Sequence, residues 1–371
     1  MRSLVFWQRM VSPHIAGLAR ALASQGSDVT FCAAEAMSDD RMRQGWTAPR
    51  IPGARVELVA PHGDAVALVS QYAPDAVHVV QGLRRNGYVA RIIGALRARR
   101  ARWGAMMETV SDAGLRGVAK RADYRFGLRW SKPDFVLAIG DRTPGWIAAR
   151  GYSAFRTFPF AYFLDPVADT GGERAGRDDF KIGFVGNMTP GKRVDLLIAA
   201  AAGLDSPNLE VTFVGDGPLD SDLRRLAERS LHASRVRWLG RLAMAEAHQV
   251  IAGLDCLVLP SDHDGWGAVV SEAMMAGVPA ICSDACGSAA AVRASLVGGV
   301  FPAGDVEALG RLLRQVVLAG PLNSSERARL KTWGRVLSGD AGARYLRAIL
   351  SAVYDGQERP DVPWEAPILR Q

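Results

Sequence analysis

The chain has 371 residues, 49% of them hydrophobic and 22% charged, and a formal net charge of +7. This composition is typical of a folded globular protein and excludes disordered and fibrous chains. The four cysteines are too few and too scattered for a disulfide framework, and no C-x-x-C pair or H-E-x-x-H helix predicts a zinc site. No run approaches the roughly 18 apolar residues of a membrane span, and Arg2 and Arg9 interrupt the N-terminal segment, so we also expect no signal peptide.

The positive charge is confined to the first half of the chain. Residues 1–168 carry 23 Lys and Arg against 13 Asp and Glu, a net charge of +10, whereas the remaining 203 residues carry 22 against 25, a net charge of −3. Most of these cations lie in residues 84–102 and 116–132. Such clusters bind anionic lipid headgroups, phosphorylated acceptors or nucleic acid, or simply form a solvated helix face. No RNA-binding aromatic motif accompanies them, so we expect no nucleic-acid partner.

In chain order, short apolar runs alternate with segments long enough for crossover helices. We predict strands at residues 4–7, 29–33, 56–59, 76–80, 103–107 and 135–139 in the first half, and at 181–185, 210–214, 236–239, 256–259 and 280–282 in the second. Nearly continuous apolar strands are typical of parallel sheets that are covered on both faces. The sequence therefore predicts an α/β protein with two Rossmann-like doubly wound domains that face a cleft.

The segment at residues 169–179, DTGGERAGRDD, is polar and rich in glycine, without apolar periodicity. We expect it to link an N-terminal domain, residues 1–168, to a C-terminal domain, residues 180–340. Apolar residues at three- and four-residue spacing predict helices at 306–318 and 341–354. We expect residues 341–371 to form a C-terminal helix and a surface tail that return toward the first domain.

The most specific motif is D-G-W-G-A-V-V-S-E, which runs from Asp264 to Glu272 after the strand at 256–259. Its glycines allow a ligand to approach the backbone, and amides at the start of a helix attract an anion such as a diphosphate. Carboxylates accept hydrogen bonds from sugar hydroxyls. Capping of the helix would explain Asp264 alone, but it does not explain Glu272, which lies beyond the first turn in an apolar segment.

A second motif, G-N-M-T-P-G-K-R from Gly186 to Arg193, joins the strand at 181–185 to a predicted helix at 194–202. It matches G-x-x-x-x-G-K, but Arg193 replaces the Ser or Thr that holds magnesium in nucleotide hydrolases. Lys192 is suited to neutralise a diphosphate without a metal, and the alternative is a solvated surface lysine. A third and weaker motif, V-G-D-G-P from Val214 to Pro218, ends the next strand.

In this order and spacing, the three motifs resemble the second domain of the family 4 glycosyltransferases, which are retaining nucleotide-sugar enzymes of the two-Rossmann GT-B architecture. The resemblance covers about residues 180–320 strongly and the first half of the chain only by architecture. It implies that Lys192 contacts the donor diphosphate, that Asp264 meets the donor sugar hydroxyls, and that Glu272 holds the ribose. It also implies a donor-binding role for Gly186, Asn187, Arg193, Gly215, Asp216, Gly265, Trp266, Gly267 and Ala268. Such enzymes normally need no metal, so the resemblance implies a nucleoside diphosphate sugar as co-substrate and no cofactor.

The chain departs from the family pattern in both halves. Asn187 stands where the family usually has arginine, so one diphosphate contact is missing or comes from Arg193, and Asp264 replaces the usual glutamate. In the first half, a loop containing His14 replaces the usual glycine-rich loop, and Glu108 stands about where many members have histidine. We expect His14 and Glu108 on the acceptor side, because strand ends face the ligand in this fold. Glu108 joins Asp264, Lys192 and Glu272 as a catalytic candidate, with a core or capping role as the alternative.

We therefore expect a hexosyl- or other glycosyltransferase of the EC 2.4 class, acting on a glycan, lipid-linked or small-molecule acceptor. The basic first domain would hold that acceptor, in the cytoplasm or on the inner face of the cytoplasmic membrane. Bacterial surface polysaccharide biosynthesis is the commonest setting of the family and is the expected pathway. The alternatives are a sugar-nucleotide epimerase of the same fold, a non-catalytic sugar-nucleotide-binding subunit, and a nucleotide hydrolase, which Arg193 disfavours. No motif identifies the donor base, the sugar, the acceptor or the oligomeric state.

Overall fold

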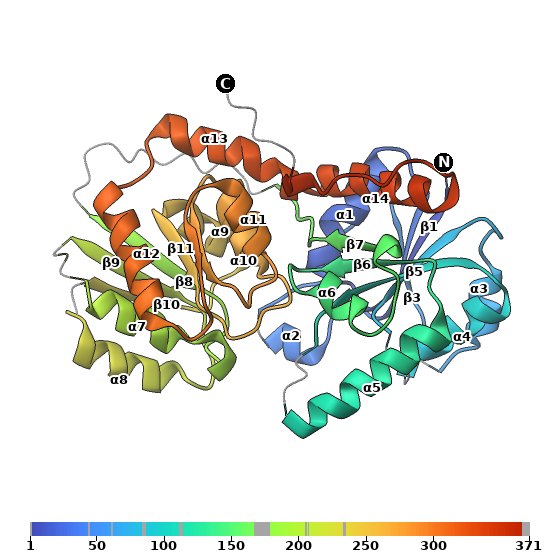
Figure 1. Ribbon diagram of the computed structural model, residues 1–371, viewed down its shortest axis with the longest axis horizontal. Coiled ribbons are helices and arrows are strands. Elements are labelled where there is room, and N and C mark those ends of the chain that lie inside the picture. The colour runs from blue at the N-terminus through green and yellow to red at the C-terminus, as the bar shows by residue number, and fades with distance from the viewer. Residues whose placement is uncertain are drawn as a thin grey trace. The chain divides into compact units, whose positions relative to one another are not determined.

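The computed structural model describes residues 2–43, 45–60, 62–83, 87–110, 114–166, 179–204, 206, 208–232 and 235–365. The chain divides into two compact units, Met1–Asp165 with Leu337–Pro363, and Pro166–Val336 with Trp364–Gln371 (Figure 1). The expected linker lies outside the described residues except for Asp179. Residues 84–86, at the start of the first basic segment, also lie outside them.

The first unit is built on a seven-stranded parallel sheet with the order β3-β2-β1-β4-β5-β6-β7. Its strands are β1 (Leu4–Met10), β2 (Val29–Glu35), β3 (Arg55–Leu58), β4 (Val77–Gln81), β5 (Arg102–Glu108), β6 (Phe135–Ile139) and β7 (Thr157–Phe160). Leu4 of β1 lies opposite Val29 on one side and Val77 on the other, so the strand order reverses beside β1, as in doubly wound folds. The six strands expected in this half are confirmed. The sequence did not predict β7, because a four-residue T-F-P-F run with a proline is a weak strand signal that is tolerated at a sheet edge.

Helices cover both faces of this sheet. They are α1 (Pro13–Ser24), α2 (Asp39–Arg43), α3 (Ala65–Ser70), α4 (Gly87–Ala98), α5 (Gly114–Ser131), α6 (Thr143–Ala148) and α14 (Gly339–Tyr354), with the 3-10 turn η1 (Ala154–Arg156). The C-terminal helix α14 returns to this unit and packs beside α1, as Figure 1 shows. Tyr345 of α14 donates a hydrogen bond to the Pro159 carbonyl at 3.0 Å, and its ring stacks on Phe160 at 5.9 Å.

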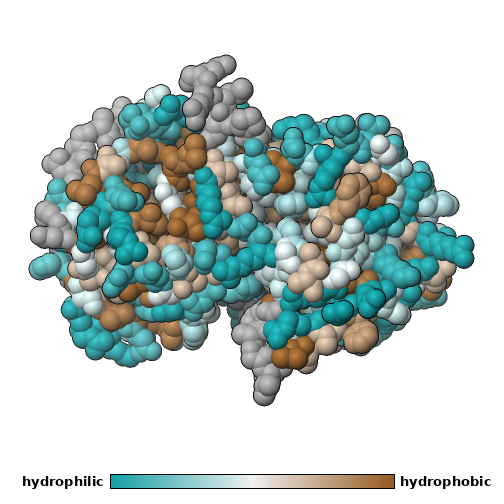
Figure 2. Space-filling view, viewed as in Figure 1, coloured by the Kyte–Doolittle hydropathy of each residue, from teal (hydrophilic) through white to brown (hydrophobic). Residues whose placement is uncertain are grey.

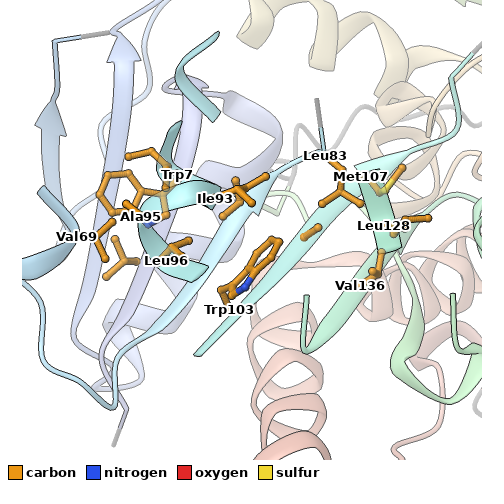
Figure 3. Packing of buried hydrophobic residues seen from close by; sticks show 14 of the residues in the cluster. Trp7, Val69, Leu83, Ile93, Ala95, Leu96, Trp103, Met107, Leu128 and Val136 are labelled. Atoms are coloured by element: carbon orange, nitrogen blue, oxygen red, sulfur yellow. The ribbon is translucent and has the colours of Figure 1, made fainter. Parts of the chain in front are cut away.

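The opposite face carries an apolar core between the sheet and α4 and α5. Trp7 of β1 and Trp103 of β5 are buried there with Ile93 of α4 and Leu128 of α5 (Figure 3). The indole of Trp7 donates a hydrogen bond to Nδ1 of His78 at 3.0 Å. Burial lowers the pKa of His78 to about 4, so this imidazole is neutral at physiological pH.

The second unit is built on a six-stranded parallel sheet with the order β10-β9-β8-β11-β12-β13. Its strands are β8 (Phe180–Val185), β9 (Leu209–Val214), β10 (Val236–Gly240), β11 (Cys256–Leu259), β12 (Ala280–Ser283) and β13 (Gly299–Phe301). Its helices are α7 (Val194–Ala202), α8 (Asp220–Ser230), α9 (Met244–Gly253), α10 (Ala268–Met275), α11 (Ala289–Ser295), α12 (Val306–Ala319) and α13 (Ser324–Gly334), with the 3-10 turns η2 (Pro190–Lys192) and η4 (Arg335–Leu337). The five expected strands are confirmed, whereas β13 and α13 were not predicted.

The expected surface tail is in part a packed segment. Val362 and Trp364, the latter in the 3-10 turn η5 (Pro363–Glu365), are 8% and 4% exposed. The Trp364 ring lies 5.6 Å from that of Trp266. We expected a surface tail, but its described part, which ends at Glu365, is packed at Val362 and Trp364. Within the described ranges, no helix is both long and apolar enough to cross a membrane.

Candidate functional site

The three sequence motifs of the second unit meet at the carboxyl edge of its sheet. Gly186 follows β8, Gly215 follows β9, and the loop that contains Asp264 follows β11. Backbone hydrogen bonds join these loops, since Met188 N donates to the Asp216 carbonyl at 2.8 Å and Asp262 N donates to the Gly191 carbonyl at 2.9 Å. In open α/β sheets, ligands bind outside the carboxyl ends of the strands. The motifs therefore form one connected surface where a ligand is expected.

Glycine is required where the first two loops touch. A Cβ atom on Gly215 would lie 2.0 Å from the carbonyl oxygen of Gly186, and the φ of Gly215 is +116°. Both the contact and the backbone angle exclude an ordinary side chain. The glycine of the V-G-D-G-P motif thus allows the backbones of the two loops to contact each other directly.

A short charge pair lies on this surface. Lys192, at the end of η2, donates from Nζ to Oδ2 of Asp264 at 2.5 Å, and the two side chains are 28% and 15% exposed. The loop around Asp264 is held by a bridge to Cys286, in which Asp264 N donates to the Ala285 carbonyl at 3.2 Å and Gly287 N donates to the Asp264 carbonyl at 3.0 Å. The structure thus brings together two residues 72 positions apart that the sequence assigned to one ligand.

The neighbouring arginine has partners of its own. Arg193 has a left-handed backbone with φ of 49°, and its guanidinium pairs with Asp195 at 3.0 Å and with Asp262 at 3.1 Å. The hydrogen bond and the charge of Asp195, followed by the charge of Asp262, raise the pKa of Arg193. A diphosphate contact from Arg193 in place of the missing arginine at Asn187 would therefore require these pairs to open.

Asp216 is likewise paired. The guanidinium of Arg241, just after β10, donates to both carboxylate oxygens of Asp216 at 2.9 and 2.8 Å. Sequence reasoning missed Arg241, because it follows a different strand and belongs to none of the motifs. This pair brings a further cation to the end of β9.

The start of α10 supplies backbone amides. Gly267 precedes the helix with φ of 84°, and a Cβ there would lie 2.7 Å from a methyl of Leu259, so the turn from Gly265 through Ala268 depends on glycine. Trp266 was expected at the donor through the amides that follow Gly265, and its side chain is only 1% exposed. Its indole donates to the hydroxyl of Ser271 at 2.9 Å. Trp266 is therefore a core residue, and only its backbone remains available to a ligand.

Glu272 lies one turn further along α10 and faces a histidine. Nε2 of His248, on α9, is 3.6 Å from Oε1 of Glu272, which is ion-pair distance, and the two side chains are 24% and 20% exposed. Interaction with Glu272 raises the pKa of His248. No sequence motif indicated a role for His248, because only the packing of α9 against α10 brings it to Glu272.

The acceptor-side candidates form an aromatic cluster in the first unit. His14 of α1 stacks on Tyr162, which follows β7, at 4.8 Å, and meets the edge of Trp46 at 5.1 Å. The Tyr162 hydroxyl donates to Oε1 of Glu108 at the end of β5, and the Arg41 guanidinium lies 4.5 Å from the centre of the Trp46 ring. The structure thus joins His14 and Glu108 through Tyr162, and neither Tyr162 nor Trp46 was predicted.

In the described part of the chain, no group of three or more His, Cys, Asp or Glu residues is arranged to hold a metal ion. The donor-edge carboxylates Asp216, Asp262 and Asp264 are each paired with a Lys or Arg side chain. The side chains of Lys192, Arg193 and Arg241 therefore bring three cations to this edge.

Comparison with known proteins agrees with this geometry. Residues 171–335 match the family model "Glycosyl transferases group 1". A GDP-mannose-dependent alpha-mannosyltransferase of Mycolicibacterium smegmatis is 27% identical over 271 residues, which are 67% of this chain and 68% of that protein. A 2-deoxystreptamine glucosyltransferase of Streptomyces kanamyceticus is 30% identical over 186 residues, 48% of this chain and 46% of that protein. The alignments thus span from less than half to about two thirds of these relatives.

Solved structures show the same fold along nearly the whole chain. Anabaena HepE in complex with UDP superposes with a TM-score of 0.73 at 16% identity, covering 94% of this chain and 100% of that one. The lipopolysaccharide outer core galactosyltransferase WaaB superposes with a TM-score of 0.69 at 15% identity, covering 94% and 99%. The expected fold class, two Rossmann-like doubly wound domains of the GT-B type, is confirmed. Residues 171–335, which are less than half of the chain, are thus similar to the group 1 glycosyltransferases.

Proposed function

We propose that this protein transfers a sugar from a nucleoside diphosphate sugar to an acceptor, with retention of configuration and without a metal ion. The observation that carries the proposal is the Lys192–Asp264 pair at the carboxyl edge of the second sheet, next to the amides that begin α10. A cation and helix amides suit a diphosphate, and a carboxylate suits the hydroxyls of the sugar attached to it. Two similar proteins are named as a mannosyltransferase and a glucosyltransferase.

In the proposed reaction, the bond between the anomeric carbon and the diphosphate oxygen breaks while the acceptor oxygen bonds to the same face of that carbon. The acceptor proton moves to the departing phosphate oxygen. Lys192 and the amides from Gly265 to Ala268 stabilise the charge that develops there, which is the main physical contribution to such catalysis. Asp264 orients the sugar and Glu272 holds the ribose. No side-chain nucleophile takes part in this reaction.

We assign the acceptor to the cluster of His14, Trp46, Glu108 and Tyr162 in the first unit. Aromatic faces cover the apolar faces of sugar rings, and the Glu108 carboxylate accepts hydrogen bonds from hydroxyls. This favours a polyhydroxylated acceptor, either a glycan, a lipid-linked glycan or a small molecule. The net charge of +10 in residues 1–168 supports a peripheral position on an anionic membrane surface, and bacterial surface polysaccharide biosynthesis is the proposed pathway.

A transfer assay tests this function. The purified chain is incubated with labelled UDP, GDP, CDP and ADP sugars, with and without a panel of glycan and lipid-linked acceptors. We expect one donor to yield labelled product and free nucleoside diphosphate, and NMR of the product to show the donor's anomeric configuration. Conversion of the donor to a sugar epimer would favour the epimerase, and tight donor binding without any turnover would favour a non-catalytic subunit.

A further inference from the structure

A pocket in the first unit plays no part in the proposed transfer. It lies between α4 and α5 and has a volume of about 820 Å³, within the roughly 300–1,000 Å³ range of ligand sites. The described residues that line it include His62, Tyr88, Ala90 and Arg91 on one side and Phe126 and Trp130 of α5 on the other. The lining is mostly apolar, with one arginine among the rings.

The same helix presents an apolar stripe to solvent. Val118, Ala122, Phe126 and Trp130 follow one another at four-residue spacing, which places them on one face of α5. Val118, Phe126 and Trp130 are 54%, 64% and 48% exposed. Phe126 and Trp130 thus expose a large apolar surface at the mouth of an open pocket, and such exposed apolar patches mark interaction sites. The α5 stripe is therefore a candidate docking face.

Positive charge lies along one side of the α5 stripe. Residues 87–132 contain eleven Lys and Arg against three Asp and Glu. Arg121, Arg125 and Arg129 each precede a stripe residue, so they follow one side of the stripe along the helix. The Arg97 guanidinium of α4 lies 4.1 Å from the centre of the Trp130 ring. Figure 2 shows hydrophobic and hydrophilic residues side by side at the lower edge of this unit, where α5 lies in Figure 1. The complementary partner is thus apolar and anionic at once.

We propose that α5 lies on an anionic lipid bilayer and that the pocket between α4 and α5 takes an acyl chain of an anionic lipid. Phe126 and Trp130 insert at the level of the headgroups, and the flanking arginines meet the lipid phosphates. Apolar rings beside a row of arginines favour a lipid over a soluble phosphorylated ligand, because a soluble ligand would leave the α5 stripe in water. The proposal rests on the peripheral membrane position proposed above, and it identifies the residues and the lipid class responsible.

Sedimentation with vesicles tests the site. The full chain is mixed with vesicles of phosphatidylcholine alone, or with about 30% phosphatidylglycerol, at about 0.1 and 0.5 M salt. We expect binding to the anionic vesicles that weakens but persists at the higher salt concentration. The double variant Phe126→Ser/Trp130→Ser should lower the partition coefficient about tenfold or more, since it removes the inserting rings. The matched control Leu318→Ser, which alters an 81% exposed residue of the second unit, should bind like the wild type.

A second variant tests the pocket separately from the α5 stripe. Ala90→Trp fills the pocket while it keeps every charge and adds apolar surface, so it should lower binding about threefold or more only if an acyl chain enters. Unchanged binding of either variant would overturn the proposal, because the protein would then adhere by charge alone. Near-UV circular dichroism confirms that each variant is folded. Calorimetric titration with donor nucleotide must give wild-type values for every variant, so a failure at the membrane is distinguishable from a failure of the proposed transferase function.

Discussion

Replacement of Asp264 by asparagine should tighten the binding of a free nucleoside diphosphate while it slows transfer. Asp264 pairs with the Lys192 ammonium at 2.5 Å, so a diphosphate has to share that cation with a carboxylate. The two side chains are 28% and 15% exposed, so the interaction is only partly screened by water. Asparagine keeps the shape of the side chain and removes the competing charge.

The size of the effect follows from the charges involved. A carboxylate and a phosphate oxygen about 5 Å apart repel by about 3 kcal/mol at an effective dielectric constant of about 20. Water and salt reach this pair, so we expect about 1 kcal/mol, or roughly fivefold tighter diphosphate binding. Transfer should fall because a charged hydrogen bond to the sugar is lost. That bond is worth about 1.5–3 kcal/mol, or roughly 10- to 150-fold in kcat/KM.

Calorimetric titration with nucleoside diphosphate, beside a transfer assay with the intact donor, measures both effects. Glu307→Gln is the control, because it removes an 86% exposed carboxylate of the same unit whose partner is Arg311 of α12. It should change neither quantity. Weaker diphosphate binding by Asp264→Asn would show that the carboxylate does not compete for Lys192. Transfer at the wild-type rate would show that it does not touch the sugar.

Four further predictions concern the metal requirement, the glycine contact and the two perturbed histidines. Activity should survive EDTA, and a loss of turnover that added magnesium or manganese restores would contradict the proposed role of Lys192. Gly215→Ala should lower the free energy of unfolding by about 2 kcal/mol or more, because its Cβ would collide with the Gly186 carbonyl. Urea unfolding measures this change. The control Gly253→Ala should lower the free energy of unfolding far less, because a Cβ there meets open space. Glu272→Gln should weaken nucleotide binding and should lower Tm more at pH 6 than at pH 9. The pKa of His248 is raised in the folded state, so its pair with Glu272 stabilises the fold below pH 6.5 and loses this effect as the pH rises through the folded-state pKa. An equal change in Tm at both pH values would be inconsistent with the pair. The pKa of His78 is lowered from 6.5 to about 4, so as the pH falls the imidazole is protonated in the unfolded state before it is protonated in the folded state. The free energy of unfolding should therefore fall by about 3 kcal/mol between pH 6.5 and about 4. His78→Gln should abolish that part of the pH dependence.

The sequence predicted the parts of the fold that repeat a local pattern. Continuous apolar runs such as residues 135–139 and 256–259 correspond to buried strands, and amphipathic spacing located α12 and α14. It missed the three-residue β13 and the proline-containing β7, because each is stabilised by the strand beside it more than by its own residues. It missed α13, whose apolar periodicity is weak and whose start is marked by the Asn323–Glu326 capping box.

The candidate site was predictable only where its chemistry lies within a motif. Lys192, Asp264 and Glu272 stand at recognisable spacings, and the structure places the first two in contact. Trp266 has the same local setting, but its indole points into the core toward Trp364, which lies almost a hundred residues away in the sequence. Tyr162, Trp46, Arg241 and His248 meet their partners only through tertiary packing, so no pattern around them indicates a role.

Binding of a nucleoside diphosphate through Lys192 is the central claim, and a thermal-shift comparison tests it most directly. The wild type, Lys192→Ala and the control Lys331→Ala, on α13 of the same unit, are heated with UDP, GDP, CDP and ADP in excess. A ligand that binds only the folded state raises Tm, so we predict that at least one diphosphate raises Tm of the wild type and of Lys331→Ala but not of Lys192→Ala. Binding of a nucleoside diphosphate through Lys192 is contradicted if no diphosphate raises Tm of the wild type, or if Lys192→Ala shows the full wild-type increase in Tm.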